Sequence, residues 1–158
     1  MLPYDAEREL APGVRARLRD AGHILGSAIA ELWLADGGRT TKVVASGDLG
    51  QPGRPILRDP TPIDEADVLL VESTYGNRDH KPLGPTLDEL VATVERTLRE
   101  KKGNVLVPAF AVGRTQELLY WFEQLSSEGR LGELEVFVDS PMATEVTEIT
   151  ARHFALFD

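Results

Sequence analysis

The sequence changes character at residues 68–80, which read VLLVESTYGNRDH. The stretch opens with four consecutive apolar residues, a pattern typical of a strand that is buried on both faces. A carboxylate, Glu72, follows that strand directly and turn-forming residues follow the carboxylate. Upstream, the pattern is that of strands joined by turns, whereas downstream strands and helices alternate. The sequence therefore predicts an α/β protein in which two architectures meet near residue 76.

The upstream part predicts a mostly antiparallel sheet. Residues 14–19 alternate apolar and polar side chains, as a half-buried strand does. Two further strands are expected over residues 28–35 and 41–45, with a turn at Asp36-Gly37-Gly38 between them. The proline-rich residues 50–62 are expected to form an extended loop.

The downstream part predicts parallel βαβ units. Apolar residues recur at helical spacing after Pro85, and further helices are expected near residues 114–127 and from Pro141 onward. Short apolar runs at residues 105–107 and 136–138 separate these helices and are expected to be strands. Strands that alternate with helices of this length are typical of parallel crossovers.

Composition excludes several classes of protein. The 158 residues are 42% hydrophobic and 27% charged, which is ordinary for a folded globular chain. No apolar run approaches 18 residues, and the N-terminus lacks the apolar region of a signal peptide. The absence of cysteine excludes disulfides, thiolate nucleophiles and cysteine-based zinc sites. We therefore expect a cytoplasmic protein that does not enter a membrane.

The charge balance argues against a basic nucleic-acid surface. Twenty-six acidic residues against 17 basic ones give a formal net charge of −9, and neither half of the chain has a basic excess. Proteins that hold nucleic acid by phosphate neutralisation alone need such an excess. Contacts with phosphate would have to be local.

Three residues in loops after predicted strands are candidates for chemistry. His23 and Asp48 each lie in a glycine-flanked loop, and Glu72 ends the apolar run. A strand-held loop can project a side chain into a cleft, and a carboxylate there needs a partner. Each residue also has an ordinary interpretation: a surface histidine, a turn-capping aspartate and an ion-paired glutamate.

Two further residues are candidates for binding phosphate or RNA. Arg114 begins a helix directly after Gly113, and Ser140 precedes Pro141 in the same way. Free amides and the helix dipole favour an anion at such positions. The alternative, which the sequence leaves open, is that Arg114 pairs with Glu117 and Ser140 only caps its helix.

Taken together, the motifs resemble a known family. AGHILGSA at 21–28, SGDLG at 46–50 and ESTYGNRDH at 72–80 are similar to consecutive motifs of the metallo-β-lactamase fold nucleases of the β-CASP group. That group includes ribonuclease J and the endonuclease subunit of the cleavage and polyadenylation factor. The similarity continues through NVLVPAFAVGRTQELL at 104–119 and VDSPMATEVTEI at 138–149.

The resemblance implies a fold and an activity. Residues 1–76 would form part of a metallo-β-lactamase αββα sandwich, and residues 77–158 part of a β-CASP parallel α/β domain. The implied activity is zinc-dependent hydrolysis of RNA phosphodiester bonds at a site with two metal ions. His23 would bind zinc, Asp48 would bridge both ions and act in catalysis, and Glu72 would orient a histidine or assist proton transfer.

The sequence departs from the family pattern in one respect. The HxHxDH motif that supplies most zinc ligands is absent, as are the later histidine motifs. We therefore expect a segment of a larger enzyme that N- and C-terminal segments complete and that could form a homodimer. The isolated chain is expected to be inactive and to bind zinc weakly or not at all. The alternatives are a non-catalytic RNA-processing scaffold and a fragment of another lactamase-fold hydrolase.

Overall fold

The computed structural model describes residues 2–157, which fall into two compact units. The first unit comprises Met1–Thr74 with His153–Asp158, and the second comprises Tyr75–Arg152. The division falls within the stretch at which the sequence pattern changes. The assignment of residues 1–76 and 77–158 to parts of two named domain types stays a prediction.

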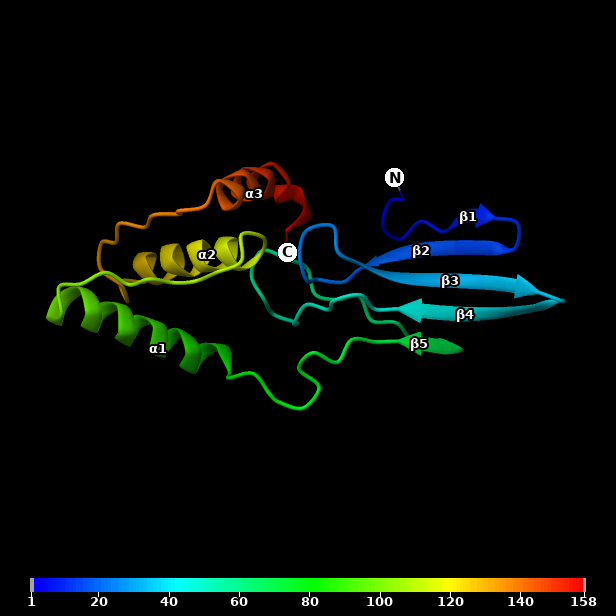
Figure 1. Ribbon diagram of the computed structural model, residues 1–158, viewed down its shortest axis with the longest axis horizontal. Coiled ribbons are helices and arrows are strands. Elements are labelled where there is room, and N and C mark those ends of the chain that lie inside the picture. The colour runs from blue at the N-terminus through cyan, green and yellow to red at the C-terminus, as the bar shows by residue number, and fades with distance from the viewer. Residues whose placement is uncertain (1, 158) are drawn as a thin grey trace. The chain divides into compact units, whose positions relative to one another are not determined.

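The first unit is built on a five-stranded sheet in the order β1-β2-β3-β4-β5 (Figure 1). Strands β1 to β4 pair antiparallel, and β5 runs parallel to β4. The predicted antiparallel sheet is confirmed. Its first strand was not expected, because the sequence of that strand shows no apolar alternation, and all four of its residues are exposed. The bounds are Arg8–Ala11, Val14–Asp20, Ala28–Asp36, Arg39–Ala45 and Val68–Leu70.

One face of this sheet is apolar. The register places Ala16 of β2 beside Leu32 of β3, and Leu32 beside Val43 of β4. Because side chains alternate between faces, the residues two positions before and after each of these three lie on the same face. The fifth strand forms the edge of this apolar face and its residues are exposed, so no other element of the described chain covers the face completely.

The prediction that residues 68–71 are buried on both faces is wrong for the described chain. Val68, Leu69, Leu70 and Val71 are 46–60% exposed. The run does form β5, but this strand is at the edge of the sheet, with β4 as its neighbour on one side. An apolar sequence makes a strand suited to a buried position, but burial also requires other elements that cover the strand.

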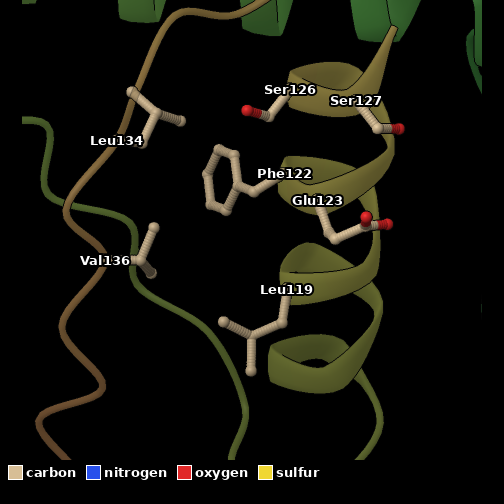
Figure 2. A pocket seen from close by; sticks show the side chains of 7 residues that line it. All are labelled: Leu119, Phe122, Glu123, Ser126, Ser127, Leu134 and Val136. Atoms are coloured by element: carbon tan, nitrogen blue, oxygen red, sulfur yellow. The ribbon is translucent and has the colours of Figure 1, made fainter.

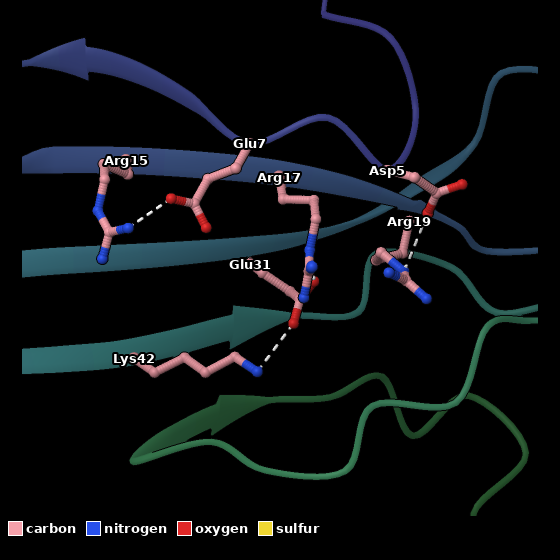
Figure 3. A network of polar contacts seen from close by, with 7 residues as sticks. All are labelled: Asp5, Glu7, Arg15, Arg17, Arg19, Glu31 and Lys42. Atoms are coloured by element: carbon pink, nitrogen blue, oxygen red, sulfur yellow. Dashed lines mark hydrogen bonds and ion pairs between the residues drawn. The ribbon is translucent and has the colours of Figure 1, made fainter.

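The opposite face of the sheet carries a charge network (Figure 3). The Glu31 side chain is 1% exposed and accepts a hydrogen bond from Arg17 Nε at 2.7 Å. It also forms an ion pair with Lys42 Nζ at 2.8 Å. Arg17 and Lys42 also lie over the Trp33 ring, at 5.3 and 5.5 Å from its centroid. Three adjacent strands are thereby joined by one buried carboxylate.

The pKa of Glu31 reflects two opposing effects. Burial of the carboxyl raises its pKa, but the hydrogen bonds and charges of Arg17 and Lys42 outweigh burial and hold the pKa below its ordinary value. Glu31 therefore contributes stability that is complete above its unfolded pKa of about 4.3 and disappears as pH falls through its lower folded-state value.

The second unit contains three helices and a small core. Helix α1 spans Leu83–Glu95 and continues as a π-helical turn, Arg96–Glu100, while α2 spans Arg114–Ser127 and α3 spans Pro141–Arg152. All three were predicted. The buried residues Val94, Leu125 and Leu131 form the centre of the core. No helix in the described part of the chain is long and apolar enough to cross a membrane.

The predicted strands at residues 105–107 and 136–138 are not formed, so the expected parallel βαβ sheet is wrong for residues 2–157. Both segments run as irregular connections (Figure 1). Val105 packs against the core, but its neighbour Leu106 is 91% exposed, and Phe137 is 84% exposed. A strand needs a hydrogen-bonded neighbour, and the described residues provide none for either segment.

A cavity beside α2 shows the same lack of cover. Leu119 and Phe122 of α2 point toward Leu134 and Val136 across an open space of about 430 Å³ (Figure 2). Interiors of folded proteins are normally close-packed, with few voids of this size. Helix α2 therefore covers one side of the segment around Val136 without enclosing it.

We predict that Glu31→Gln lowers the free energy of unfolding of the first unit by about 2–3 kcal/mol at pH 7, because two cations lose their buried partner. Urea unfolding of a chain that also carries Trp121→Phe measures this, since Trp33 then reports on the first unit. The difference should shrink as pH falls through the lowered folded-state pKa of Glu31, because the carboxyl then loses its charge in both states.

The matched control is Glu7→Gln, which removes the partner of Arg15 in a largely exposed ion pair. Exposed pairs contribute less than about 1 kcal/mol. Equal losses for the two variants would contradict the assignment of Glu31 as the centre of the network.

Candidate functional site

The site begins with two loops that meet at a pair of glycines. One loop follows β2 and the other follows β4, and the Gly50 amide donates to the Ala21 carbonyl at 2.8 Å. A Cβ atom on Gly50 would lie 1.7 Å from the carbonyl oxygen of Gly22. Gly22 itself has φ +64°, and a Cβ there would meet the Arg58 carbonyl oxygen at 2.6 Å. Only glycine permits this approach.

The approach of the loops brings His23 and Asp48 together. The distance from His23 Nε2 to Asp48 Oδ2 is 3.8 Å, and the two side chains are 44% and 77% exposed. The gap exceeds a hydrogen bond. An imidazole nitrogen and a carboxylate oxygen that face each other across an accessible gap are a donor pair suited to zinc.

Glu72 connects the end of β5 to the loop that carries Asp48. Its carboxylate accepts hydrogen bonds from the amides of Leu49 at 2.9 Å and Thr74 at 3.3 Å. These hydrogen bonds, led by that of Leu49, hold the pKa of Glu72 below its ordinary value, and the charge of His23 acts in the same direction. Glu72 is therefore ionised at neutral pH and fixes the backbone next to Asp48.

Ser46 completes this connection and was not singled out by the sequence analysis. Its buried hydroxyl accepts the Glu72 amide at 3.1 Å and donates to the Gly47 carbonyl at 2.6 Å. Its position before Gly47-Asp48 in a strand-end loop was the available signal. The structure thus brings all three predicted residues of this region to one place, while their catalytic and metal-binding roles stay predictions.

The described residues do not complete a metal site. Within residues 2–157, no group of three or more histidine, cysteine, aspartate or glutamate side chains could hold a metal ion. Zinc in proteins is commonly four-coordinate. His23 and Asp48 can therefore supply only part of a ligand set.

Comparisons with known proteins point to one group of proteins over most of the chain. A model of the Beta-Casp domain matches residues 115–158. An RNase J-like protein of Methanocaldococcus jannaschii is 36% identical over 144 residues, which are 89% of this chain and 33% of the relative. A ribonuclease of Thermus thermophilus is 43% identical over 134 residues, 84% of this chain and 29% of the relative. The chain thus matches a segment of the β-CASP ribonucleases.

A third relative has a different name. The transcription termination factor FttA of Methanothermobacter thermautotrophicus is 38% identical over 157 residues, 96% of this chain and 24% of the factor. The chain therefore spans between 24% and 33% of the length of these three relatives. The matches confirm the family resemblance of the motifs.

The two predicted phosphate-binding residues lie in the second unit of this chain, at the starts of α2 and α3. Arg114 Nη1 is paired with Glu117 Oε2 at 2.8 Å, and Ser140 Oγ accepts the amide of Ala143 at 3.2 Å. Both contacts correspond to the ordinary alternatives considered for these residues. Their binding of phosphate or RNA stays a prediction.

We predict that Gly50→Ala lowers the free energy of unfolding by about 3 kcal/mol, because the added methyl group collides with the backbone of Gly22. Urea unfolding measures the loss, and displaced ring signals of His23 in NMR spectra should accompany it. The control is Gly84→Ala in α1, where a Cβ meets nothing within 4 Å. That variant should be neutral or up to about 1 kcal/mol more stable. Equal behaviour of the two variants would refute the role of close approach.

We predict that Glu72→Ala lowers the hydrogen-exchange protection of the Leu49 amide, because the amide loses its acceptor. In the unsubstituted chain, this protection should also decrease as pH falls through the lowered pKa of Glu72, since only the carboxylate accepts strongly. NMR-detected exchange measures both. The Gly50 amide, bonded to Ala21, is the internal reference, and an unchanged Leu49 amide would rule out the proposed connection.

Proposed function

We propose that this β-CASP chain forms part of a zinc-dependent ribonuclease that hydrolyses RNA phosphodiester bonds. The observation that carries the proposal is the convergence of His23, Asp48 and Glu72 at the ends of β2, β4 and β5. Relatives that match most of the chain are named ribonuclease and RNase J-like protein. We propose RNA as the substrate and a cytoplasmic location.

The donor chemistry supports two residues as metal ligands. His23 and Asp48 would hold zinc, with Asp48 able to bridge two ions because its exposed carboxylate has two oxygens. Two bound ions would supply an activated water and charge stabilisation for phosphodiester hydrolysis. The remaining ligands would come from other segments of a longer protein.

The electrostatics of Glu72 argue against a role as proton donor. A general acid must carry a proton near neutral pH and therefore needs a raised pKa. The pKa of Glu72 is instead lowered, because it accepts the Leu49 and Thr74 amides. We propose that Glu72 is an ionised positioning residue that fixes the Asp48 loop, by analogy with the outer carboxylates of metal sites.

The sheet supports the finer fold proposal. Its apolar face, centred on Ala16, Leu32 and Val43, extends to the exposed residues of β5. A sheet face of this kind is stable in water when a second layer covers it. We propose that residues 1–76 form part of a metallo-β-lactamase sandwich, and that other segments of the same protein, or a second copy in a homodimer, contribute the cover.

A second candidate function is a non-catalytic RNA-processing scaffold. The observation that favours it is the absence of any three-residue metal-ligand group among residues 2–157. The two functions make different predictions for Asp48. A catalytic protein requires its carboxylate, whereas a scaffold tolerates its removal.

The test uses a chimera in which this chain replaces the matching stretch of the Thermus thermophilus ribonuclease. We expect the chimera to bind zinc and cleave RNA, and Asp48→Ala to reduce cleavage by more than about 100-fold, since even outer residues of metal sites contribute 10–100-fold. Asp36→Ala, at the last residue of β3, is the matched control and should not change the rate.

Two results would separate the candidate functions. Undiminished cleavage by the Asp48→Ala chimera would refute the proposed mechanism. A folded chimera that binds RNA without cleaving it would favour the scaffold. The isolated 158-residue chain should bind zinc weakly or not at all in calorimetry, because it offers an incomplete ligand set.

A further inference from the structure

A turn at the start of the second unit gathers three planar side chains. The Tyr75 and His80 rings have centroids 4.5 Å apart with an interplanar angle of 55°. The guanidinium carbon of Arg78 lies 4.7 Å from the centroid of the Tyr75 ring. The turn is closed by the Arg78 amide, which donates to the Tyr75 carbonyl at 3.2 Å.

This cluster is at the surface and not in the core. Tyr75 is 50% exposed, and Arg78 and His80 are also exposed. The buried centre of the second unit consists of other residues, namely Val94, Leu125 and Leu131. Removing the aromatic rings would therefore leave the core of the unit intact.

The Arg78 guanidinium is not neutralised by a carboxylate. Within the described residues it has no ion pair, and its contact is with the π-face of Tyr75. Several other arginines have carboxylate partners, among them Arg15, Arg17, Arg19, Arg99, Arg114 and Arg130. Arg78 thus keeps its hydrogen-bond donors available for an anion, and guanidinium groups bind phosphate in a bidentate manner.

We propose that Tyr75, Arg78 and His80 form a binding site for single-stranded RNA, in which a base stacks on the exposed rings and Arg78 binds an adjacent phosphate. Proteins bind single strands by this combination of aromatic stacking and guanidinium contact. Bases within a duplex are already stacked and cannot reach the rings. The proposal rests on the proposed function, since it identifies where this segment holds the substrate.

Charge explains why stacking should carry much of the affinity. The chain has a formal net charge of −9, so general electrostatic attraction to RNA is absent. Stacking does not depend on net charge, and it accepts any base because every base has a π-face. One phosphate contact through Arg78 should give a shallow salt dependence, with log K falling by about 0.7 per log unit of salt.

The test measures binding of a short single-stranded RNA that contains 2-aminopurine to the 158-residue chain. Stacking should quench the fluorescence of this base. Tyr75→Ala should weaken binding by about 5- to 150-fold, the range expected for the loss of one stacked base. Tyr75→Phe should retain both binding and quenching, because it keeps the ring. Arg78→Gln should remove the salt dependence.

The control substitution is Tyr120→Ala on α2, which removes a tyrosine of similar exposure that packs edge-on to Trp121. It should leave binding unchanged. Circular dichroism of each variant verifies that the helices are retained, and Tyr75→Phe and Arg78→Gln test the site without removing the ring.

Three results would overturn the inference: no detectable RNA binding, equal affinity of the Tyr75→Ala chain, or tighter binding of duplex than of single-stranded RNA. None of them bears on the Asp48 chimera experiment, so the proposed function can survive the loss of this site. Conversely, a chimera without cleavage activity would leave a Tyr75-dependent RNA site in place.

Discussion

The candidate site depends on the contact between two backbone segments at Gly22 and Gly50. The Gly50 amide reaches the Ala21 carbonyl because Gly50 carries no Cβ, which would collide with the backbone of Gly22. This contact connects the loop after β2 with the loop after β4, and thereby fixes the separation of His23 and Asp48. Side chains that perform chemistry are exposed to water here, so their placement rests on the backbone beneath them.

A second constraint acts from the next strand of the sheet. Glu72 and Ser46 exchange hydrogen bonds with loop backbone, so the end of β5 and the loop that carries Asp48 are held together. The parallel pairing of β4 and β5 makes this geometry available, since both strands end at the same edge. The ion pairs of Glu31 join β2, β3 and β4, the strands from which two of these loops extend.

Local sequence patterns predicted the central strands, the turn after β3 and all three helices, because alternation and helical spacing are local properties. That His23, Asp48 and Glu72 share a site was implied by the family resemblance and not by these local patterns. The patterns could not reveal whether Val68–Leu70 or residues 105–107 are covered, because burial and strand pairing depend on distant partners. Ser46 was missed for a related reason: its importance arises from Glu72, 26 residues away.

The edge of β5 and the net charge have a joint consequence for behaviour in solution. An exposed apolar edge strand offers unpaired backbone groups to any neighbouring chain, and such edges promote association between copies. A formal charge of −9 on 158 residues opposes close approach of those copies by mutual repulsion. The acidic composition, which is unfavourable for binding nucleic acid, therefore opposes association between copies of the chain. This repulsion should weaken in high salt.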